Sequence, residues 1–398
     1  MNDRAPAATR YDFSAVHAAM RRYVDADLLP GVSCAVLLGR DLVDLHCEGW
    51  ADRENKVALR ADHLFRAFSN TKLVTSCAAL LLVEEGRIGL DDPVERYLPQ
   101  LGKLRVLREG AKSVEDTEPA RRPITIRHLL THSSGLAYGV FDPGTLMYQA
   151  YNDRRVLNPL TTLAEMVEIL SGLPLAYPPG EGWEYSVATD VVGRVVEVVS
   201  GQRLDEFFKS RIFAPLGMAD TGFVVPEAKR ARLAAYYAGT SLEDPMKPGL
   251  ARIDDAPYPG AYLKPVARLS GGGGLVTSLP DMISLMRSLL PGGATILGRE
   301  TIAQAMTNQL PAGRWIRFPN LGEITGKGYG LAGAVTVAPT ALDPAGSAGE
   351  LQWGGVAGTH WWIAPQKNLV GLFMTQRRMA FWHPFFFELR KLVYEAVR

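Results

Sequence analysis

The sequence predicts a mixed α/β (α+β) fold, in which strands from both ends of the chain form one antiparallel sheet and a helical lobe is inserted between them. Near the N-terminus, apolar runs at residues 31–38 and 42–47 flank Gly39-Arg40-Asp41 and indicate a β-hairpin. Strand-like segments rich in glycine, aromatic and β-branched residues return late in the chain, at residues 329–337, 349–363 and 369–375. The middle of the chain has apolar residues at helical spacing, at residues 126–131, 162–170 and 187–199.

Helices are also expected to flank the sheet. Apolar residues at helical spacing predict one helix over residues 13–29, before the hairpin, and another over residues 385–397, at the end of the chain. A further helical run, residues 73–85, ends at Gly86. Two segments predict irregular structure: the charged residues 102–123, as a solvated loop or hairpin, and the Pro- and Gly-rich residues 226–265, as a long loop.

Composition and charge limit the classes of partner. The 398 residues are 47% hydrophobic and 21% charged, as in a folded globular protein. Lys and Arg number 43 and Asp and Glu 42, so nothing in the charge indicates nucleic acid or an anionic membrane surface. The N-terminal residues lack the apolar core of a signal peptide, and no apolar run is long enough to span a bilayer. We expect a cytoplasmic protein that binds a small, neutral molecule, and the sequence indicates no particular oligomeric state.

No metal or cofactor is expected. The cysteines, Cys34, Cys47 and Cys77, lie in apolar surroundings and fit reduced thiols without metal-ligand spacing. His128 and His132 stand four residues apart, but Leu129 occupies the position where a zinc hydrolase of the His-Glu-x-x-His type has its glutamate. The run of glycines at residues 271–274 lacks the Lys and Ser/Thr of a phosphate-binding loop.

Ser69-Asn70-Thr71-Lys72 is the most informative stretch. If a helix begins at or just before Ser69, its hydroxyl and the Lys72 amine project from the same face and can share a proton. An adjacent amine that is neutral, or made less basic by burial, would help to remove the hydroxyl proton and make Ser69 a nucleophile. Alone, this spacing is more often a serine near a helix N-cap followed by an unrelated lysine.

A second candidate is Tyr185, at the start of the helix expected over residues 187–199. The preceding Pro178-Pro179-Gly180 forms a turn that would hold this tyrosine in a fixed place. A phenol near an ammonium group loses its proton more easily and could carry a proton between Ser69 and a leaving group. Considered alone, Tyr185 fits a core aromatic residue better.

The third candidate segment is Trp353-Gly354-Gly355-Val356, within one long expected strand. A pair of glycines in a strand marks a bulge or a close approach of a ligand to the backbone. A main-chain N–H there could join that of Ser69 in stabilising the oxyanion of a tetrahedral intermediate. A glycine-rich strand packed on an aromatic neighbour is an equally good interpretation.

The order of these segments, Ser-x-x-Lys, then Tyr-Ser, then Trp-Gly-Gly, resembles the serine β-lactamase and penicillin-binding protein superfamily. Within it, the chain is similar to the family VIII carboxylesterases, which resemble class C β-lactamases. Supporting segments are Phe65-Arg66-Ala67-Phe68, residues 128–136, Pro179-Gly180, Pro215-Leu216-Gly217-Met218 and residues 271–274. The resemblance implies that Ser69 is acylated, that Lys72 is its proton acceptor or electrostatic partner, and that Tyr185 is the general base and acid. It places the oxyanion donors at Ser69 and Val356.

The same resemblance implies a single catalytic unit over residues 1–398 with a serine β-lactamase/DD-peptidase-like fold. Its sheet lobe would contain residues 1–68 and 201–398, its helical lobe residues 69–200, and the active site would lie between the lobes. His360, close to Trp353, is a candidate pocket residue. His132 and His360 could also suggest a Ser-His-Asp triad, but the Gly-x-Ser-x-Gly elbow of that architecture is absent, because its nearest match begins with Ala345.

Two departures from the superfamily pattern indicate the substrate. Tyr185-Ser186-Val187 stands where β-lactamases and peptidases usually have Tyr-x-Asn or Ser-x-Asn, and Trp353-Gly354-Gly355 stands where they usually have Lys-Thr-Gly. The missing amide and cation weaken recognition of anionic lactams and peptides. We therefore expect a serine esterase for short to medium neutral acyl esters, with acyl transfer as a side activity. The alternatives are a β-lactamase, DD-peptidase or small-amide hydrolase, and a non-catalytic binding or sensing protein of the same fold.

Overall fold

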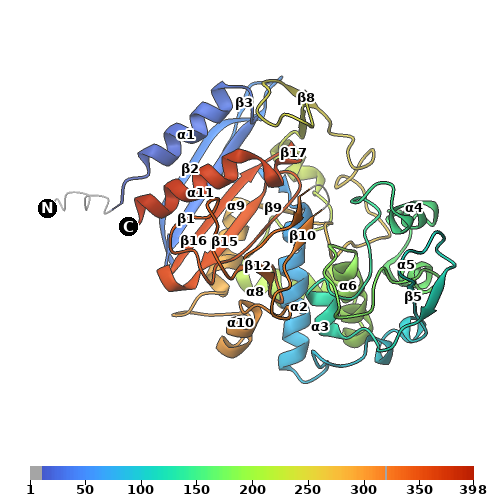
Figure 1. Ribbon diagram of the computed structural model, residues 1–398. Coiled ribbons are helices and arrows are strands. Elements are labelled where there is room, and N and C mark those ends of the chain that lie inside the picture. Colours follow the sequence, from blue (N-terminus) through green and yellow to red (C-terminus); the bar gives the residue numbers. More distant parts are fainter. Residues whose placement is uncertain (1–10, 319–320) are drawn as a thin grey trace, which may run out of the picture.

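The computed structural model describes residues 11–318 and 321–398, and within them an antiparallel eight-stranded sheet is built from both ends of the chain (Figure 1). Strand β1 (Gly31–Leu38) lies between β2 (Asp41–Asp52) and β16 (Leu369–Thr375), with Val32 opposite Thr375 and Leu38 opposite Leu369. The other strands are β3 (Val57–Ala58), β12 (Lys327–Tyr329), β13 (Ala334–Thr336), β14 (Leu351–Gly354) and β15 (His360–Ala364), in the order β12-β13-β14-β15-β16-β1-β2-β3.

Strand β1 is buried on both faces because helices cover both sides of the sheet. Alternate side chains contribute to two different cores: Cys34 and Val36 pack with α1 (Ser14–Asp25) and α11 (Pro384–Ala396). Ala35 and Leu37 face the opposite side and join the main core. The alternation follows from the two-residue period of a strand, and it explains why residues 31–38 read as an uninterrupted apolar run. The expected antiparallel sheet with flanking helices is confirmed.

The middle of the chain is mainly helical. Helix α2 (Thr71–Glu84) is buried over nearly its whole length and packs on α6 (Ala188–Ser200), so that it lies between the sheet and the remaining helices of this region (Figure 1). Those helices are α3 (Ile126–Leu130), α4 (Leu146–Asp153) and α5 (Leu163–Ser171), and the charged segment before them forms the hairpin of β5 (Arg105–Leu107) and β6 (Thr117–Pro119). The lobe boundaries at residues 69 and 200 stay a prediction.

Short elements connect these parts. The helices among them are α7 (Leu204–Phe208), α8 (Ala214–Leu216), α9 (Leu279–Ser288) and α10 (Arg299–Ala305). The small sheets pair β4 (Leu64–Arg66) with β9 (Val276–Ser278), β10 (Arg317–Phe318) with β11 (Gly322–Glu323), and β7 (Tyr237–Gly239) with β8 (Leu250–Arg252) and β17 (Arg377–Arg378).

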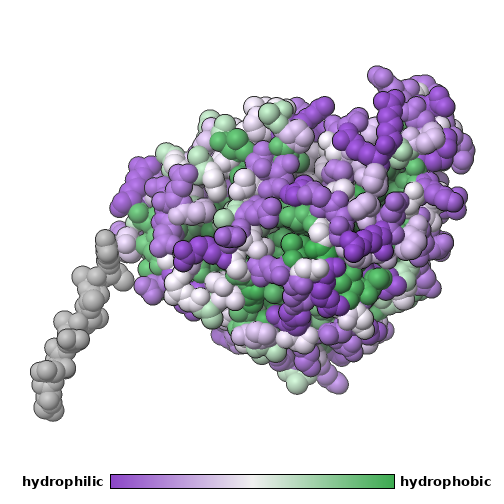
Figure 2. All heavy atoms as spheres, turned by 90° about the horizontal axis from the view of Figure 1, so that it is seen from below, coloured by the Kyte–Doolittle hydropathy of each residue, from purple (hydrophilic) through white to green (hydrophobic). Residues whose placement is uncertain are grey.

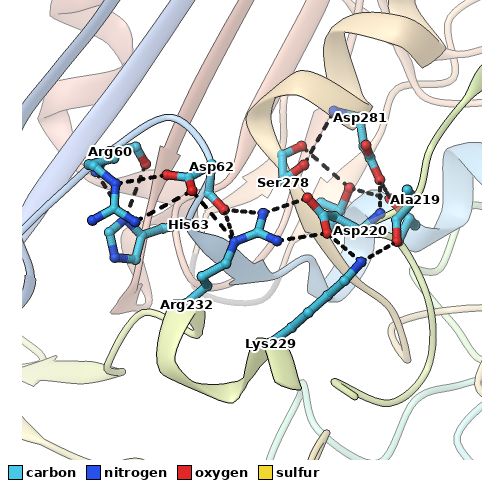
Figure 3. A network of polar contacts seen from close by, with 11 residues as sticks. Arg60, Asp62, His63, Ala219, Asp220, Lys229, Arg232, Ser278 and Asp281 are labelled. Atoms are coloured by element: carbon cyan, nitrogen blue, oxygen red, sulfur yellow. Dashed lines mark hydrogen bonds and ion pairs between the residues drawn. The ribbon is translucent and has the colours of Figure 1, made fainter. Parts of the chain in front are cut away.

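Two expectations from the sequence need correction. Residues 226–265 are not wholly irregular, since they contain a 3-10 helix (Glu227–Arg232) as well as β7 and β8. Arg232 of that helix forms ion pairs with Asp220 and Asp62, and these hold the segment against the turn before β4 (Figure 3). Residues 349–363 are two strands, not one, because the chain reverses between β14 and β15 at Gly358, which has a φ of 81°.

One face of the molecule carries both polar and apolar side chains (Figure 2). On the face seen in Figure 2, hydrophobic side chains gather near the middle and hydrophilic side chains surround them. Within the described residues, no helix is long and apolar enough to cross a membrane.

Candidate active site

Ser69 is presented by a tight turn between β4 and α2. The preceding residue, Phe68, has a φ of 44°, in the left-handed region that residues other than glycine rarely adopt. Ser69 is the middle residue of a single 3-10 turn (Phe68–Asn70), and α2 follows directly. The Ala67 N–H donates to the Leu275 carbonyl at 2.9 Å, and the Ala67 carbonyl accepts a hydrogen bond from the Thr359 hydroxyl at 3.1 Å. The Ser69 side chain is half-buried and so partly accessible. The two hydrogen bonds of Ala67 fix the backbone that leads into it.

The structure brings Ser69, Lys72 and Tyr185 together. The Tyr185 hydroxyl donates a hydrogen bond to Ser69 Oγ at 2.7 Å, and Lys72 Nζ lies 3.4 Å from the same oxygen. Lys72 Nζ is also 4.6 Å from the centroid of the Tyr185 ring, within the range of a cation–π interaction. Ser69 and Lys72 lie one turn apart on the chain, whereas Tyr185 comes from the segment before α6. The three groups can therefore exchange a proton without rearrangement of the backbone.

Lys72 is buried, with only 2% of its surface exposed. Burial lowers the pKa of Lys72, but the Tyr138 and Tyr185 phenols and the Asp190 carboxylate outweigh burial and raise it above its ordinary value. The expectation of an amine made less basic by burial was therefore wrong. The raised pKa favours the ammonium form of Lys72, and its Nζ donates to the Gly272 carbonyl at 2.6 Å.

The glycine run at residues 271–274 forms the wall behind Lys72. A Cβ atom on Gly272 would lie 2.5 Å from Asp190 Oδ2 and 3.3 Å from Lys72 Nζ, so a larger residue there would collide with these groups. Ser270 donates to Asp190 Oδ1 at 2.6 Å and fixes the carboxylate. The glycines are thus required for close packing around the ammonium group.

Trp353 and the glycines that follow it lie beside Ser69. Trp353 Nε1 is 3.4 Å from the Tyr185 hydroxyl and donates to it. A Cβ atom on Gly355 would lie 2.5 Å from the Ala67 carbonyl oxygen, so the end of β14 lies directly against the turn that carries Ser69. The Gly355 N–H donates to Thr359, whereas within the described residues the N–H groups of Ser69 and Val356 donate to no protein acceptor. Both remain available to a substrate oxygen.

His360 lies next to Gly354 but does not join this cluster. Its ring stacks on Phe386 of α11, with centroids 3.8 Å apart, and its Nε2 lies 3.3 Å from the Ala380 carbonyl oxygen. Burial lowers the pKa of His360 to about 3, so the ring is neutral. Its contacts are those of a residue that packs β15 against α11, and they do not support the interpretation of His360 as a pocket residue.

His132 lies closer to the site than His360. Its ring centroid is 4.9 Å from that of Tyr185, and its Nδ1 lies 3.1 Å from the Ser186 hydroxyl. Burial holds the pKa of His132 well below its ordinary value. A neutral imidazole therefore packs against the Tyr185 ring.

A ring of aromatic side chains around Tyr185 could not be identified from the sequence. The ring centroids of Tyr138, Phe141 and Phe318 lie 5.5, 5.7 and 5.7 Å from that of Tyr185. These residues are half-buried or buried, and they come from segments almost 180 residues apart in the chain. Their spacing follows neither the helical nor the strand period, so no local pattern indicated that they would meet. The ring makes the surroundings of Ser69 largely apolar.

Among the described residues, no group of three His, Cys, Asp or Glu side chains is arranged to hold a metal ion.

Comparison with known proteins shows the family. Residues 16–381 match the family described as Beta-lactamase. The chain is 32% identical to Esterase EstB of Burkholderia gladioli, over 87% of this chain and 86% of that protein. It is 35% identical to lovastatin esterase of Penicillium rubens, over 78% of this chain and 79% of that protein. Among solved structures, EstCE1, a hydrolase with promiscuous acyltransferase activity, superposes with a TM-score of 0.80 at 26% identity, over 95% of this chain and 97% of that one. The chain belongs to the β-lactamase family, in the branch that resembles the family VIII carboxylesterases.

Proposed function

We propose that the protein is a carboxylesterase that cleaves short to medium neutral acyl esters through an acyl-enzyme on Ser69. The observation that carries this proposal is the 2.7 Å hydrogen bond between the Tyr185 hydroxyl and Ser69 Oγ, with the buried Lys72 ammonium 3.4 Å from the same oxygen. A serine next to a proton carrier and a fixed positive charge is an activated nucleophile.

In the proposed reaction, Ser69 Oγ attacks the ester carbonyl carbon and its proton passes to the Tyr185–Lys72 pair. The pair must begin this step with one proton fewer than a phenol and an ammonium together hold. In this reactive form the hydrogen bond is reversed: the Ser69 hydroxyl donates to the Tyr185 oxygen, 2.7 Å away, which accepts the proton, while the Lys72 ammonium stabilises the phenolate. The Ser69 and Val356 N–H groups would donate to the carbonyl oxygen as it becomes negative.

The tetrahedral intermediate then collapses. The bond between the carbonyl carbon and the alcohol oxygen breaks, and Tyr185 returns the proton to the leaving alcohol. Water attacks the acyl carbon and loses a proton to the same pair. The bond between this carbon and Ser69 Oγ then breaks, the pair returns the proton to Ser69 Oγ, and the acid leaves. An alcohol that outcompetes water at this step would receive the acyl group, and the promiscuous acyl transfer described for EstCE1 supports this side activity.

Two features favour esters over lactams and peptides. Val187, at the position where the relatives that act on amides usually have asparagine, is fully buried, so this position offers no group to a substrate. Trp353 stands where those relatives usually have lysine, and its Nε1 is directed to Tyr185. A carboxylate on the substrate would therefore find no cation at this position.

The proposed substrate is a small ester, and the proposed location is the cytoplasm. All three cysteines are free, and Cys34 and Cys77 are buried, which agrees with a reducing compartment.

The proposal is tested by comparing the hydrolysis of p-nitrophenyl butyrate with that of a chromogenic cephalosporin. We expect rapid ester cleavage, slow lactam cleavage, and loss of ester turnover in Ser69→Ala with an unchanged circular dichroism spectrum. Ester hydrolysis that persists in the folded Ser69→Ala protein would contradict the acyl-enzyme. A preference for the cephalosporin would instead assign the protein to the amide-cleaving alternatives.

A further inference from the structure

Three charged side chains meet at the edge of the aromatic ring around Tyr185. Arg317 Nη1 donates to Asp142 Oδ2 at 3.3 Å and to Glu184 Oε2 at 3.0 Å. Both carboxylates are largely buried, with side chains 16% and 19% exposed. We call Asp142, Glu184 and Arg317 the charged clasp. It joins a loop and a turn from the helical part of the chain to strand β10.

Each clasp residue is the direct neighbour in sequence of one aromatic residue at the site. Asp142 follows Phe141, Glu184 precedes Tyr185, and Arg317 precedes Phe318. The Phe141 and Phe318 rings lie 6.4 Å apart and each lies 5.7 Å from the Tyr185 ring. A shift of any clasp residue therefore moves an aromatic side chain beside the proposed catalytic tyrosine.

Strand β10 is short, and the residue before it, Ile316, ties it to β12 through a hydrogen bond of 2.8 Å from its N–H to the Lys327 carbonyl. It pairs with β11 through two residue pairs, Arg317 with Glu323 and Phe318 with Gly322, and it is not part of the eight-stranded sheet. A two-stranded ribbon of this length is marginal by itself. The position of Phe318 therefore depends on side-chain contacts as well as on these backbone bonds, and the Arg317 ion pairs are among the side-chain contacts.

Arg317 is the positively charged member of the clasp, and the other two members are carboxyl groups. Burial and a hydrogen bond with Asp142 raise the pKa of Glu184 to about 7, although Arg317 acts in the opposite direction. Without the guanidinium, two largely buried carboxyl groups would face each other. Loss of the guanidinium would raise the pKa of Glu184 further, so this carboxyl would take up a proton, and the tie from strand β10 to the Phe141 loop and the Tyr185 turn would be lost.

There is room for such a movement. A cavity of about 620 Å³ lies beyond the clasp and is lined by all three clasp residues as well as by Tyr138 and Phe141. The clasp and two residues of the ring around Tyr185, Tyr138 and Phe141, therefore border the same cavity. If it loosens, Phe141 can turn toward the cavity and leave space for a longer substrate.

We propose that Arg317 is a specificity-determining positioning residue, which through Asp142 and Glu184 holds Phe141 and Phe318 against Tyr185 and so limits the length of the hydrocarbon that the ester carries. This inference rests on the proposed esterase function. Arg317 itself does not contact the reacting atoms, so its removal changes the choice of substrate more than the chemical step.

The test measures kcat and KM of wild type, Arg317→Ala and Arg317→Lys on p-nitrophenyl acetate, butyrate, octanoate and dodecanoate. We expect Arg317→Ala to raise the octanoate-to-acetate ratio of kcat/KM by about tenfold, since a few methylene contacts change discrimination by this order. The change should appear mainly as a lower KM for octanoate. Arg317→Lys should restore part of the wild-type ratio, because it keeps the charge.

Arg122→Ala is the matched control. Arg122 forms an exposed ion pair with Glu181 at 2.7 Å. Glu181 lies four residues before Tyr185, and neither Arg122 nor Glu181 is next in sequence to an aromatic residue of the ring around Tyr185. We expect its ratio to stay at the wild-type value. An unchanged ratio in Arg317→Ala, or an equal change in Arg122→Ala, would overturn the inference.

A second variant keeps the test decisive if Arg317→Ala does not fold. Phe141→Ala directly removes the ring that is proposed to limit the length of the substrate, and it should also raise the octanoate-to-acetate ratio of kcat/KM. If the clasp acts through Phe141, adding Arg317→Lys to Phe141→Ala should change the ratio less than Arg317→Lys does alone. Additive effects would contradict the inference. Hydrolysis that survives in Ser69→Ala would instead refute the proposed function, whatever the ratio shows.

Discussion

The protonation of Lys72 decides how Ser69 could be activated. The residue types at positions 69 and 72 predict that the two side chains meet, because one helical turn separates them. The direction of the pKa shift depends on Tyr138, Tyr185 and Asp190, which are distant in sequence. In the proposed mechanism, Lys72 with its raised pKa serves as a fixed positive charge, and the movement of the proton is left to Tyr185.

Tyr185→Phe tests this assignment. The variant keeps the ring and its aromatic contacts but removes the oxygen that lies 2.7 Å from Ser69 Oγ. We expect kcat for p-nitrophenyl butyrate to fall by about 10²–10⁴-fold, the range for loss of a general base or acid. Tyr97→Phe is the control, since its hydroxyl bonds Asp92 away from the site. Activity of Tyr185→Phe close to wild type would leave Tyr185 a packing role only.

At the scale of elements, the turn between β14 and β15 contacts the segment that carries Ser69 as directly as the helix that carries Lys72 does. The sequence indicated that the glycines after Trp353 allow a close approach, and the structure identifies the approaching group as the backbone of Ala67. The length of the strand was misjudged, because aromatic and β-branched residues continue on both sides of Gly355 and Gly358 and conceal the reversal. Local patterns predicted the strands, whereas the contact between the two segments depends on pairing over almost 300 residues.

Gly355→Ala should separate these two elements. The added Cβ would lie 2.5 Å from the Ala67 carbonyl oxygen and 2.4 Å from Thr359 Oγ1, so the turn must shift away from Ser69. The Val356 N–H would move with it, and we expect kcat to fall by about 10²–10³-fold, as for loss of one oxyanion donor. Gly172→Ala is the control, because its nearest neighbour lies 3.6 Å away. Wild-type kcat in Gly355→Ala would show that Val356 does not serve as a donor.

At the scale of the whole molecule, the two ends of the chain complete one sheet. Strand β1 pairs with β16, and α1 packs on α11 over the same face. The apolar patterns at both ends made this arrangement predictable. The buried charges that join α11 to the sheet were not predictable, because each of them is isolated in the sequence. Arg390 of α11, 1% exposed, contacts Asp343 at 2.7 Å and Glu350 at 2.8 Å.

Replacing Arg390 with alanine should destabilise the whole fold. It leaves the carboxylates of Asp343 and Glu350 buried with less compensating charge, and such a loss costs about 3–5 kcal/mol. Burial already raises the pKa of Glu350, and removal of Arg390 raises it further, so the protonated form becomes favoured. The loss of stability should therefore be largest at pH 8 and smaller at pH 5, as measured by urea unfolding at both values. Arg203→Ala, which breaks an exposed pair with Asp205, should change stability by less than about 1 kcal/mol. Equal stability of Arg390→Ala and wild type at pH 8 would mean that these charges do not tie α11 to the sheet.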